Sequence, residues 1–124
     1  MSTHDVTPCD ALYAAGHYML ERSRVEDAAV LFRTMLLADA ADERGWLALG
    51  ACHEQLEQLV MAEELYAAGA QMARTKVRCL LAAARVFSQL DDDRADEALE
   101  QAERFARTDE EVELVERELS RRKS

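Results

Sequence analysis

The sequence predicts an all-α solenoid of three helix-turn-helix repeats followed by a C-terminal capping helix. The first observation is that the chain of 124 residues overlays on itself at a spacing of 34 residues. The second is that apolar residues recur at helical spacing throughout, without the alternating runs that mark strands. The third is composition, since one proline and four glycines leave long stretches free for helices.

Small and apolar residues carry the internal repeat. Four positions of the first copy correspond to four of the second, and the pattern resumes in a third: Leu12, Ala15, Gly16 and Ala28; Trp46, Leu49, Gly50 and Ala62; then Leu80, Ala83 and Ala84. A period of 34 residues with these residue types is typical of tetratricopeptide repeats. Such helix pairs stack into a concave surface that holds another protein, so the sequence favours a binding protein over an enzyme.

The first repeat is expected over residues 9–42, after a polar, aperiodic segment, residues 1–8, that is expected to be frayed. Thr7 suits the cap of a helix, and Pro8 suits its first turn, where the missing N–H of proline costs nothing. The apolar spacing then predicts helices over 9–22 and 25–38.

Two further repeats and a terminal helix complete the expected chain. The second repeat, 43–76, and the third, 77–107, predict helices over 43–56, 59–72, 76–90 and 94–107. Three aspartates, 91–93, add two residues to the third repeat and move its alanine to Ala98. A capping helix is expected over 108–124, because Thr108 and Glu111 form a capping-box pattern and the last repeat needs a cover.

Small residues are expected where the two helices of each repeat cross closely. The equivalent positions are Gly16, Gly50 and Ala84 on the first helices, faced by Ala28, Ala62 and Ala98 on the second. The aromatic residues beside these crossings are interpreted as core: Phe32, Trp46, Tyr66 and Phe87. The proline that usually ends a repeat is replaced by Ala40 and Arg74, so the turns between repeats are expected to be less sharply terminated.

Charge and hydropathy exclude several classes of function. The formal net charge of -10 argues against nucleic acid, whose binding needs a clustered basic face. About half of the 25 acidic residues lie in the last quarter of the chain, where they either keep the protein soluble or recognise a basic partner. No apolar run approaches the ~18 residues that cross a membrane, and no leader pattern opens the chain. We therefore expect a cytoplasmic protein without stable membrane insertion.

Neither the cysteines nor the histidines form a metal-binding pattern. The cysteines lie within helical patterns, form no CxxC pair and are expected to be buried thiols: Cys9, Cys52 and Cys79. The histidines are far apart in sequence and show no zinc spacing: His4, His17 and His53. We therefore expect neither a metal nor any other cofactor.

In this architecture the first helix of each repeat lines the concave side, so the period predicts which residues face a ligand. Tyr13, Leu47 and Leu81 are equivalent to one another, and Leu20 is apolar at another inward position. Because the packing of helix pairs does not require these apolar side chains, they predict a stripe that binds an extended peptide. The alternative is that the terminal helix folds back and covers Leu47 and Leu81.

Polar residues accompany the apolar stripe. His17, Ala51 and Arg85 form one equivalent row, and Arg44 and Arg78 belong to another. No nucleophile accompanies His17 in a known motif, so we interpret it as a polar contact and not as a catalytic group. Arg44, Arg78 and Arg85 predict local positive charge suited to peptide carbonyls or a carboxylate, although ordinary solvation explains each one singly.

Three segments resemble the tetratricopeptide chaperones of bacterial type III secretion translocators: residues 11–16, residues 25–35 and, most closely, GWLALGACHEQL at 45–56. The resemblance spans about residues 12–106. It implies a cytoplasmic chaperone that binds an extended segment of a secreted client, keeps it soluble and export-competent, and releases it unchanged. It also implies that the client lies in a groove formed by Tyr13, His17, Leu20, Leu47, Ala51 and Leu81.

Two alternatives remain open at this point. The implied client is a translocator or a smaller secretion component, and a homodimer is compatible with the resemblance. The competing hypothesis is a generic tetratricopeptide scaffold or adaptor that joins folded partners. A clamp for free carboxy-terminal tails would need groove rows rich in Lys and Asn, whereas the rows here contain Tyr, Leu and Leu in one case and His, Ala and Arg in the other. The sequence therefore favours a chaperone for apolar segments.

Overall fold

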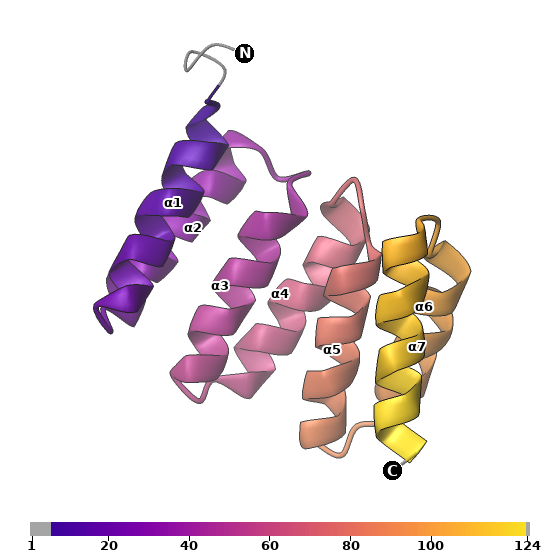
Figure 1. Cartoon of the computed structure of the whole chain (residues 1–124). Coiled ribbons are helices and arrows are strands. Elements are labelled where there is room, and N and C mark those ends of the chain that lie inside the picture. The colour runs from indigo at the N-terminus through magenta and orange to yellow at the C-terminus, as the bar shows by residue number, and fades with distance from the viewer. Residues whose placement is uncertain (1–5, 124) are drawn as a thin grey trace.

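The computed structural model describes residues 6–123, which form seven α-helices and no β-strand. This result confirms the predicted all-α class. The helices in chain order are α1 (Pro8–Glu21), α2 (Val25–Ala38), α3 (Glu43–Gln55), α4 (Leu59–Met72), α5 (Val77–Gln89), α6 (Arg94–Phe105) and α7 (Asp109–Lys123) (Figure 1).

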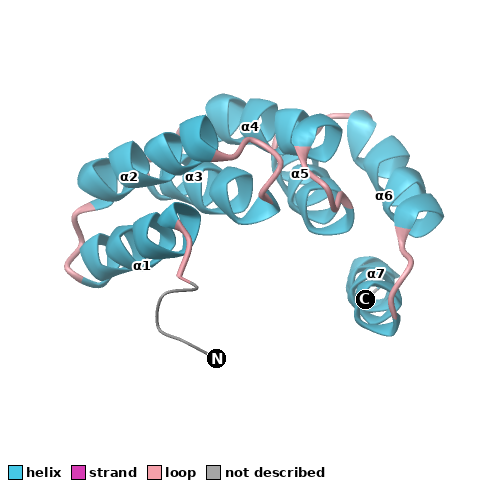
Figure 2. Ribbon diagram, turned by 90° about the horizontal axis from the view of Figure 1, so that it is seen from above, coloured by secondary structure: helices cyan, strands magenta, loops and turns pink. Residues whose placement is uncertain are grey.

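The helices stack into a short curved solenoid. Each helix packs against the next along the chain, and α5 also contacts α3 and α7. Seen from above in Figure 2, α2 and α4 follow the outer side of an arc, whereas α1 and α7 stand at the two ends of its inner side. The first helices of the three repeats, α1, α3 and α5, therefore line the inner face, and α7 closes the C-terminal end.

The first helix begins at Pro8, which is one residue earlier than expected from a frayed segment over 1–8. Residues 1–5 of that segment lie outside the described residues, but Pro8 is already the first residue of α1. The N–H of Asp10 donates to the Thr7 hydroxyl and the N–H of Thr7 donates to the Asp10 carboxylate, each at 3.1 Å. This capping box satisfies N–H groups that would otherwise be unpaired, so it holds the start of α1 in place.

In the first two repeats, a glycine of the first helix lies against an aromatic ring of the second helix at the helix crossing. A Cβ atom added to Gly16 would stand 2.3 Å from the ring of Phe32, and one added to Gly50 would stand 2.3 Å from the ring of Tyr66. The facing alanines of the first two repeats, such as Ala62, are fully buried as predicted. The expected alanine-to-glycine contact is therefore supplemented by a ring that only glycine leaves room for.

The turn inside each repeat uses a left-handed residue that is not glycine. Ser23, Glu57 and Asp91 have φ angles of 60°, 60° and 58°, and they are spaced by the repeat period. The left-handed residue of the turn before α6, Asp91, is therefore still at the repeat spacing. The extra residues of the third repeat come after Asp91. Such a conformation costs roughly 1–2 kcal/mol for most residues other than glycine.

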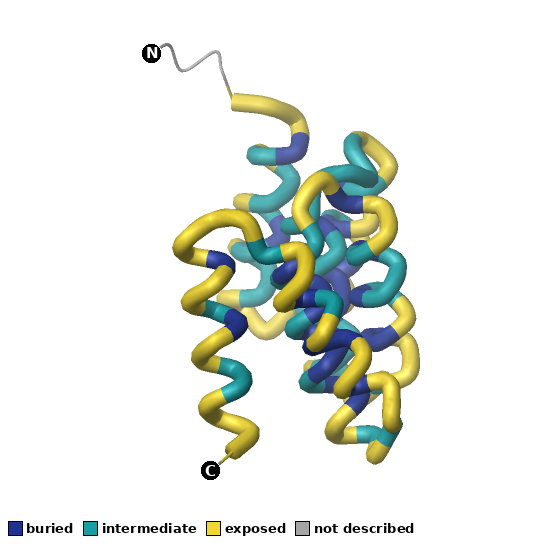
Figure 3. Tube along the Cα trace, turned by 90° about the vertical axis from the view of Figure 1, so that its right-hand side faces the viewer, coloured by how far each residue is buried: buried dark blue, intermediate teal, exposed yellow. Residues whose placement is uncertain are grey.

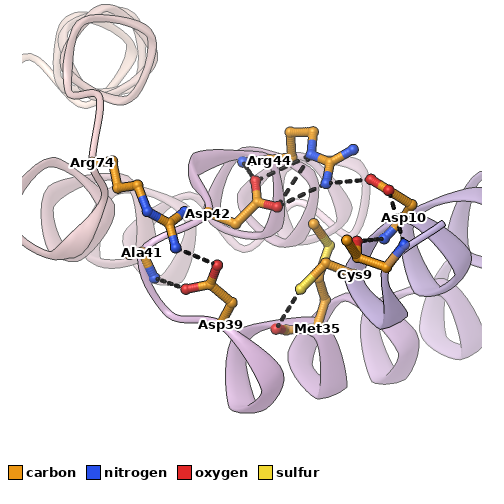
Figure 4. Close-up of polar contacts among 9 residues, drawn as sticks. Cys9, Asp10, Met35, Asp39, Ala41, Asp42, Arg44 and Arg74 are labelled. Carbon is orange, nitrogen blue, oxygen red and sulfur yellow. Dashed lines mark hydrogen bonds and ion pairs between the residues drawn. The ribbon is translucent and has the colours of Figure 1, made fainter. Parts of the chain in front are cut away.

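Polar contacts hold the turns between repeats, where the usual proline is missing. The backbone N–H of Arg74 donates to the carbonyl of Ala41 at 2.8 Å, and its guanidinium donates to Asp39 at 2.6 Å (Figure 4). Trp46 donates its indole N–H to the carbonyl of Ala40 at 2.7 Å. The turns are therefore better fixed than the absence of proline predicts, because side chains take over the role of the rigid ring.

The core runs along the contacts between helices and holds all three cysteines. Figure 3 shows that the buried positions gather where helices face one another. Burial raises the pKa of Cys52 to about 11 and that of Cys79 to about 12. Cys9 is also buried, and its thiol donates to the carbonyl of Met35 at 3.8 Å. The expectation of buried thiols is thus confirmed.

The last helix covers the end of the third repeat as predicted. The Glu111 N–H donates to the Thr108 hydroxyl at 3.0 Å, and the Thr108 N–H donates back to the Glu111 carboxylate at 3.2 Å. Val115 is 4% exposed and belongs to a cluster with Val77 and Ala102. Throughout residues 6–123, the helices lack the length and apolar character that a bilayer crossing requires.

Candidate binding groove

A pocket of about 410 Å³ opens on the inner face between α1, α3 and α5. Six of the nine groove residues predicted from the sequence line it, together with two that were not predicted. The lining residues are Tyr13 and His17 of α1, Glu43, Arg44, Leu47, Ala48 and Ala51 of α3, and Arg78 of α5.

Tyr13 and His17 form an aromatic wall on α1. They lie one helical turn apart, so their rings meet edge to face with centroids 4.5 Å apart. The imidazole of His17 also meets the buried ring of Phe32, at 5.5 Å between centroids. The Arg44 guanidinium lies 4.9 Å from the centre of the Tyr13 ring. These contacts fix the orientation of the wall.

The opposite side of the pocket is apolar and belongs to α3. Leu47 and Ala51 lie one turn apart on the same face of the helix, and Ala48 lies beside them. The short side chains of Ala48 and Ala51 leave the space that the pocket occupies, while the half-buried Leu47 supplies an apolar surface. The pocket therefore offers room for an apolar side chain, with polar groups around it.

Arg44 is held in a network of ion pairs at the rim of the pocket. Its guanidinium contacts Asp42 at 2.8 Å and Asp10 at 2.9 Å (Figure 4). Hydrogen bonds from Arg44 hold the pKa of Asp42 below its ordinary value. A hydrogen bond from the backbone of Thr7, followed by those from Arg44, does the same to the pKa of Asp10. Arg44 thus joins the first and second repeats.

The other two predicted arginines are paired as well. Arg78 contacts Glu43 at 3.3 Å and also donates to Glu110 of α7. Arg85 contacts Glu54 at 2.8 Å. The predicted local positive charge of the inner face is therefore wrong, because five carboxylates surround the three guanidinium groups. The reason is that the arginines bridge neighbouring helices, so their N–H groups already donate to carboxylates within the chain.

Three of the predicted groove residues do not line the pocket. Leu20 packs against the core of the first repeat, and Arg85 lies beyond the pocket at Glu54. Leu81 packs against the cluster that contains Val115 of α7. Leu81 therefore packs into the apolar cluster that α7 joins through Val115, whereas Leu47 lines the open pocket.

The pocket also contains residues that the sequence reasoning missed. Glu43 precedes Leu47 by one helical turn, so helical spacing alone could have placed it on the inner face. Beyond the pocket, Glu54 accepts hydrogen bonds from both Arg85 and Tyr66. No sequence signal reveals this second arrangement, because it depends on side chains from three different helices.

Two atoms of the pocket residues are buried without a hydrogen-bond partner: Nε2 of His17 and Oε2 of Glu43. Buried polar atoms normally have a hydrogen-bond partner, so these two atoms are exceptions to that rule. No serine, threonine or cysteine belongs to the pocket lining that could serve as a nucleophile beside His17. Across residues 6–123, no cluster of His, Cys, Asp and Glu side chains is arranged to hold a metal ion.

A curved stack of helix pairs with an apolar pocket on its inner helices defines a tetratricopeptide binding protein. No protein-family model matches the sequence, and no curated protein is significantly similar to it. Solved structures, in contrast, match over nearly the whole chain.

One similar structure is the type III secretion chaperone SycD of Yersinia enterocolitica in complex with a peptide of the translocator YopD. It is 29% identical, with a TM-score of 0.76, over 90% of this chain and 86% of SycD. PcrH of Pseudomonas aeruginosa is 26% identical, with a TM-score of 0.76, over 100% of this chain and 96% of PcrH. PcrH bound to the chaperone binding region of PopB matches at 28% identity and a TM-score of 0.78, over 97% of this chain and 96% of PcrH. The chain therefore has the fold of the type III secretion translocator chaperones, and the resemblance predicted from its sequence is confirmed.

Proposed function

We propose that the chain is a cytoplasmic type III secretion chaperone that holds an extended apolar segment of a secreted client in its inner groove. The observation that carries this proposal is the apolar pocket between α1, α3 and α5 in a fold whose solved examples include SycD with a translocator peptide. The client is a translocator or a smaller secretion component, which the chaperone keeps soluble and export-competent.

The chemistry of the pocket suits an extended segment. Tyr13 and Leu47 provide apolar surface on two helices, and the alanines of α3 leave depth between them. An apolar side chain that enters this pocket is withdrawn from water, which stabilises binding and also removes an aggregation-prone surface of the client. The paired charges at the rim remain in contact with solvent, so they keep the loaded complex soluble.

The main alternative is a scaffold that joins folded partners. A scaffold would present a broad surface to a folded domain, whereas the apolar surface of this groove is confined to one pocket with charged residues around it. The groove chemistry therefore favours the chaperone. A homodimer is part of the proposal, since one similar structure, 27% identical with a TM-score of 0.77, is described as an alternative dimer of SycD.

The proposal is tested by co-expressing the chain with translocators of the same secretion system. A chaperone should shift its client from the insoluble to the soluble fraction and should retain a short synthetic peptide from that client. A scaffold should bind a folded partner domain and ignore the peptide. Binding that requires the folded domain would reject the chaperone in favour of the scaffold.

A further inference from the structure

The pocket residues carry two buried polar atoms that have no hydrogen-bond partner. Nε2 of His17 and Oε2 of Glu43 come from different helices, are covered from solvent, and belong to residues that line the same pocket. An unpaired buried polar atom lowers the stability of the fold, so native proteins seldom retain one without a use.

No neighbouring side chain of the chain supplies the missing partners. The other oxygen of Glu43, Oε1, already accepts a hydrogen bond from Arg78 at 3.3 Å. The Arg44 guanidinium is directed to Asp42 and Asp10. The ring of His17 rests against the rings of Tyr13 and Phe32. Both atoms are therefore left for a group from outside the chain, and the main chain of a bound segment carries the N–H and C=O groups that match them.

We propose that Glu43 and His17 bind the main chain of the client: the Glu43 carboxylate accepts a peptide N–H, and the His17 Nε2–H donates to a peptide carbonyl. The apolar side chain next to this peptide group enters between Tyr13 and Leu47. The inference rests on the proposed function and deepens it, because it names the client groups that the pocket recognises. An extended segment leaves its N–H and C=O groups free, whereas a helix uses them internally.

The local contacts permit the movement that docking requires. Both side chains have to turn their covered atoms toward the pocket. Glu43 gives up a 3.3 Å contact, which is a long one, and His17 is held only by ring contacts to Tyr13 and Phe32. Arg78 keeps Glu110 of α7 as a partner when Glu43 turns. Because main-chain groups are common to every sequence, this pair holds any extended segment, and the apolar pocket selects among them.

The test uses a short peptide probe selected from a displayed random library on the wild-type protein. The probe is the tightest binder that loses binding to the Leu47→Asp variant. Each amide of the probe is replaced in turn by an ester, which removes one N–H and keeps the side chain. We expect one ester that weakens binding to wild type roughly tenfold, since the N–H donates to a charged acceptor.

Two variants assign that N–H to Glu43. In Glu43→Met, which keeps the length of the side chain but carries no oxygen acceptor, the sensitive ester should weaken binding by only about twofold, because the two changes remove the same interaction. Glu110→Gln is the matched control: it removes the other carboxylate of Arg78, and the ester should still cost roughly tenfold. His17→Phe keeps the ring contacts, and it should weaken the probe by about threefold without lowering the melting temperature.

Each outcome decides the inference. The inference is overturned if no ester weakens binding to the wild-type protein, and also if the ester effect persists unchanged in Glu43→Met. In either case the probe still requires Leu47, so the proposed function stands. If no selected peptide is sensitive to Leu47→Asp, the groove does not bind extended segments, and the proposed function fails with the inference.

Discussion

Gly50 lies directly against the ring of Tyr66. A methyl group added to Gly50 would stand only 2.3 Å from a carbon of that ring. The same relation joins Gly16 and Phe32 one repeat earlier. In the third repeat the glycine position holds Ala84, and α6 has no aromatic residue at the corresponding place. The ring and the glycine therefore occur together and are lost together. This indicates that a large side chain on the second helix requires the smallest residue on the first.

Gly50→Ala tests this complementarity. Helix propensity alone would make the variant more stable by ~1 kcal/mol. The clash with Tyr66 should reverse that sign and destabilise the protein by roughly 1–3 kcal/mol. Ala84→Gly is the control without an opposing ring. It should lose about 1 kcal/mol through helix propensity and roughly 1 kcal/mol more through the lost burial of the methyl group, because Ala84 is fully buried. Urea denaturation measures both, and a Gly50→Ala protein as stable as wild type would contradict the argument.

The helices were the most predictable part of the fold. Their observed ends lie within two residues of the predicted ones, because the apolar period, the Thr7–Pro8 start and the Thr108–Glu111 box are all local signals. The left-handed turn residues were not predicted. Glycine is the usual signal for such a conformation, and Glu57 gives no such signal.

Glu57→Gly should therefore stabilise the protein by roughly 1 kcal/mol, because glycine adopts a φ of 60° without the steric cost of a side chain. Glu64→Gly, in the interior of α4, should instead destabilise it by ~1 kcal/mol. Thermal and urea melts of both variants provide the comparison. A loss of stability in both would show that the turn is not strained.

The groove was predictable in part. Tyr13 and Leu47 followed from the period, since equivalent positions of a solenoid face the same side. The partners of Arg78 did not follow, because Glu43 and Glu110 come from helices whose relative position no local pattern encodes. The period also carries no information about α7, which lies outside the repeats and covers Leu81.

The buried thiols lead to a prediction about reactivity. Cys52 and Cys79 are fully buried, and Cys9 is 7% exposed. Burial raises all three pKa values, so little thiolate forms near pH 8. A thiol-alkylating reagent should leave the native protein unmodified over minutes and label all three residues in denaturant. Mass spectrometry reads out both states, and rapid labelling of the native protein would mean that the core opens.

Glu63 predicts an unusual dependence of stability on pH. It is 7% exposed, and burial raises its pKa above the ordinary value of 4.5, partly offset by Arg94 at 3.7 Å. Because the folded pKa exceeds the unfolded one, the stability linked to this group is present below pH 4.5 and is lost as pH rises through the folded value.

Glu63→Gln should therefore stabilise the protein at about pH 7 and change little at about pH 4, where the glutamate is already protonated. Glu100→Gln, at an exposed position of α6, is the control and should have little effect at either pH. Urea denaturation at both pH values measures the difference. A Glu63→Gln protein that is less stable near neutral pH would mean that the ion pair with Arg94 outweighs the cost of burial.

The last prediction separates the open part of the groove from the part that α7 covers. Leu47→Asp places a charge in the pocket, so it should abolish client binding. Because the half-buried Leu47 also packs against the core cluster of α5 and α6, the melting temperature should fall slightly, and by less than in Leu81→Asp.

Leu81→Asp should behave differently from its repeat equivalent. Leu81 packs against the cluster that holds Val115 of α7, so the charge should loosen α7 and lower the melting temperature. Val60→Asp, at a position 59% exposed on the outer helix α4, is the control and should affect neither quantity. Pull-down of co-expressed client beside thermal melts gives both readouts. If Leu47→Asp melts early and Leu81→Asp does not, the two leucines have the opposite roles, and the binding pocket lies beneath α7.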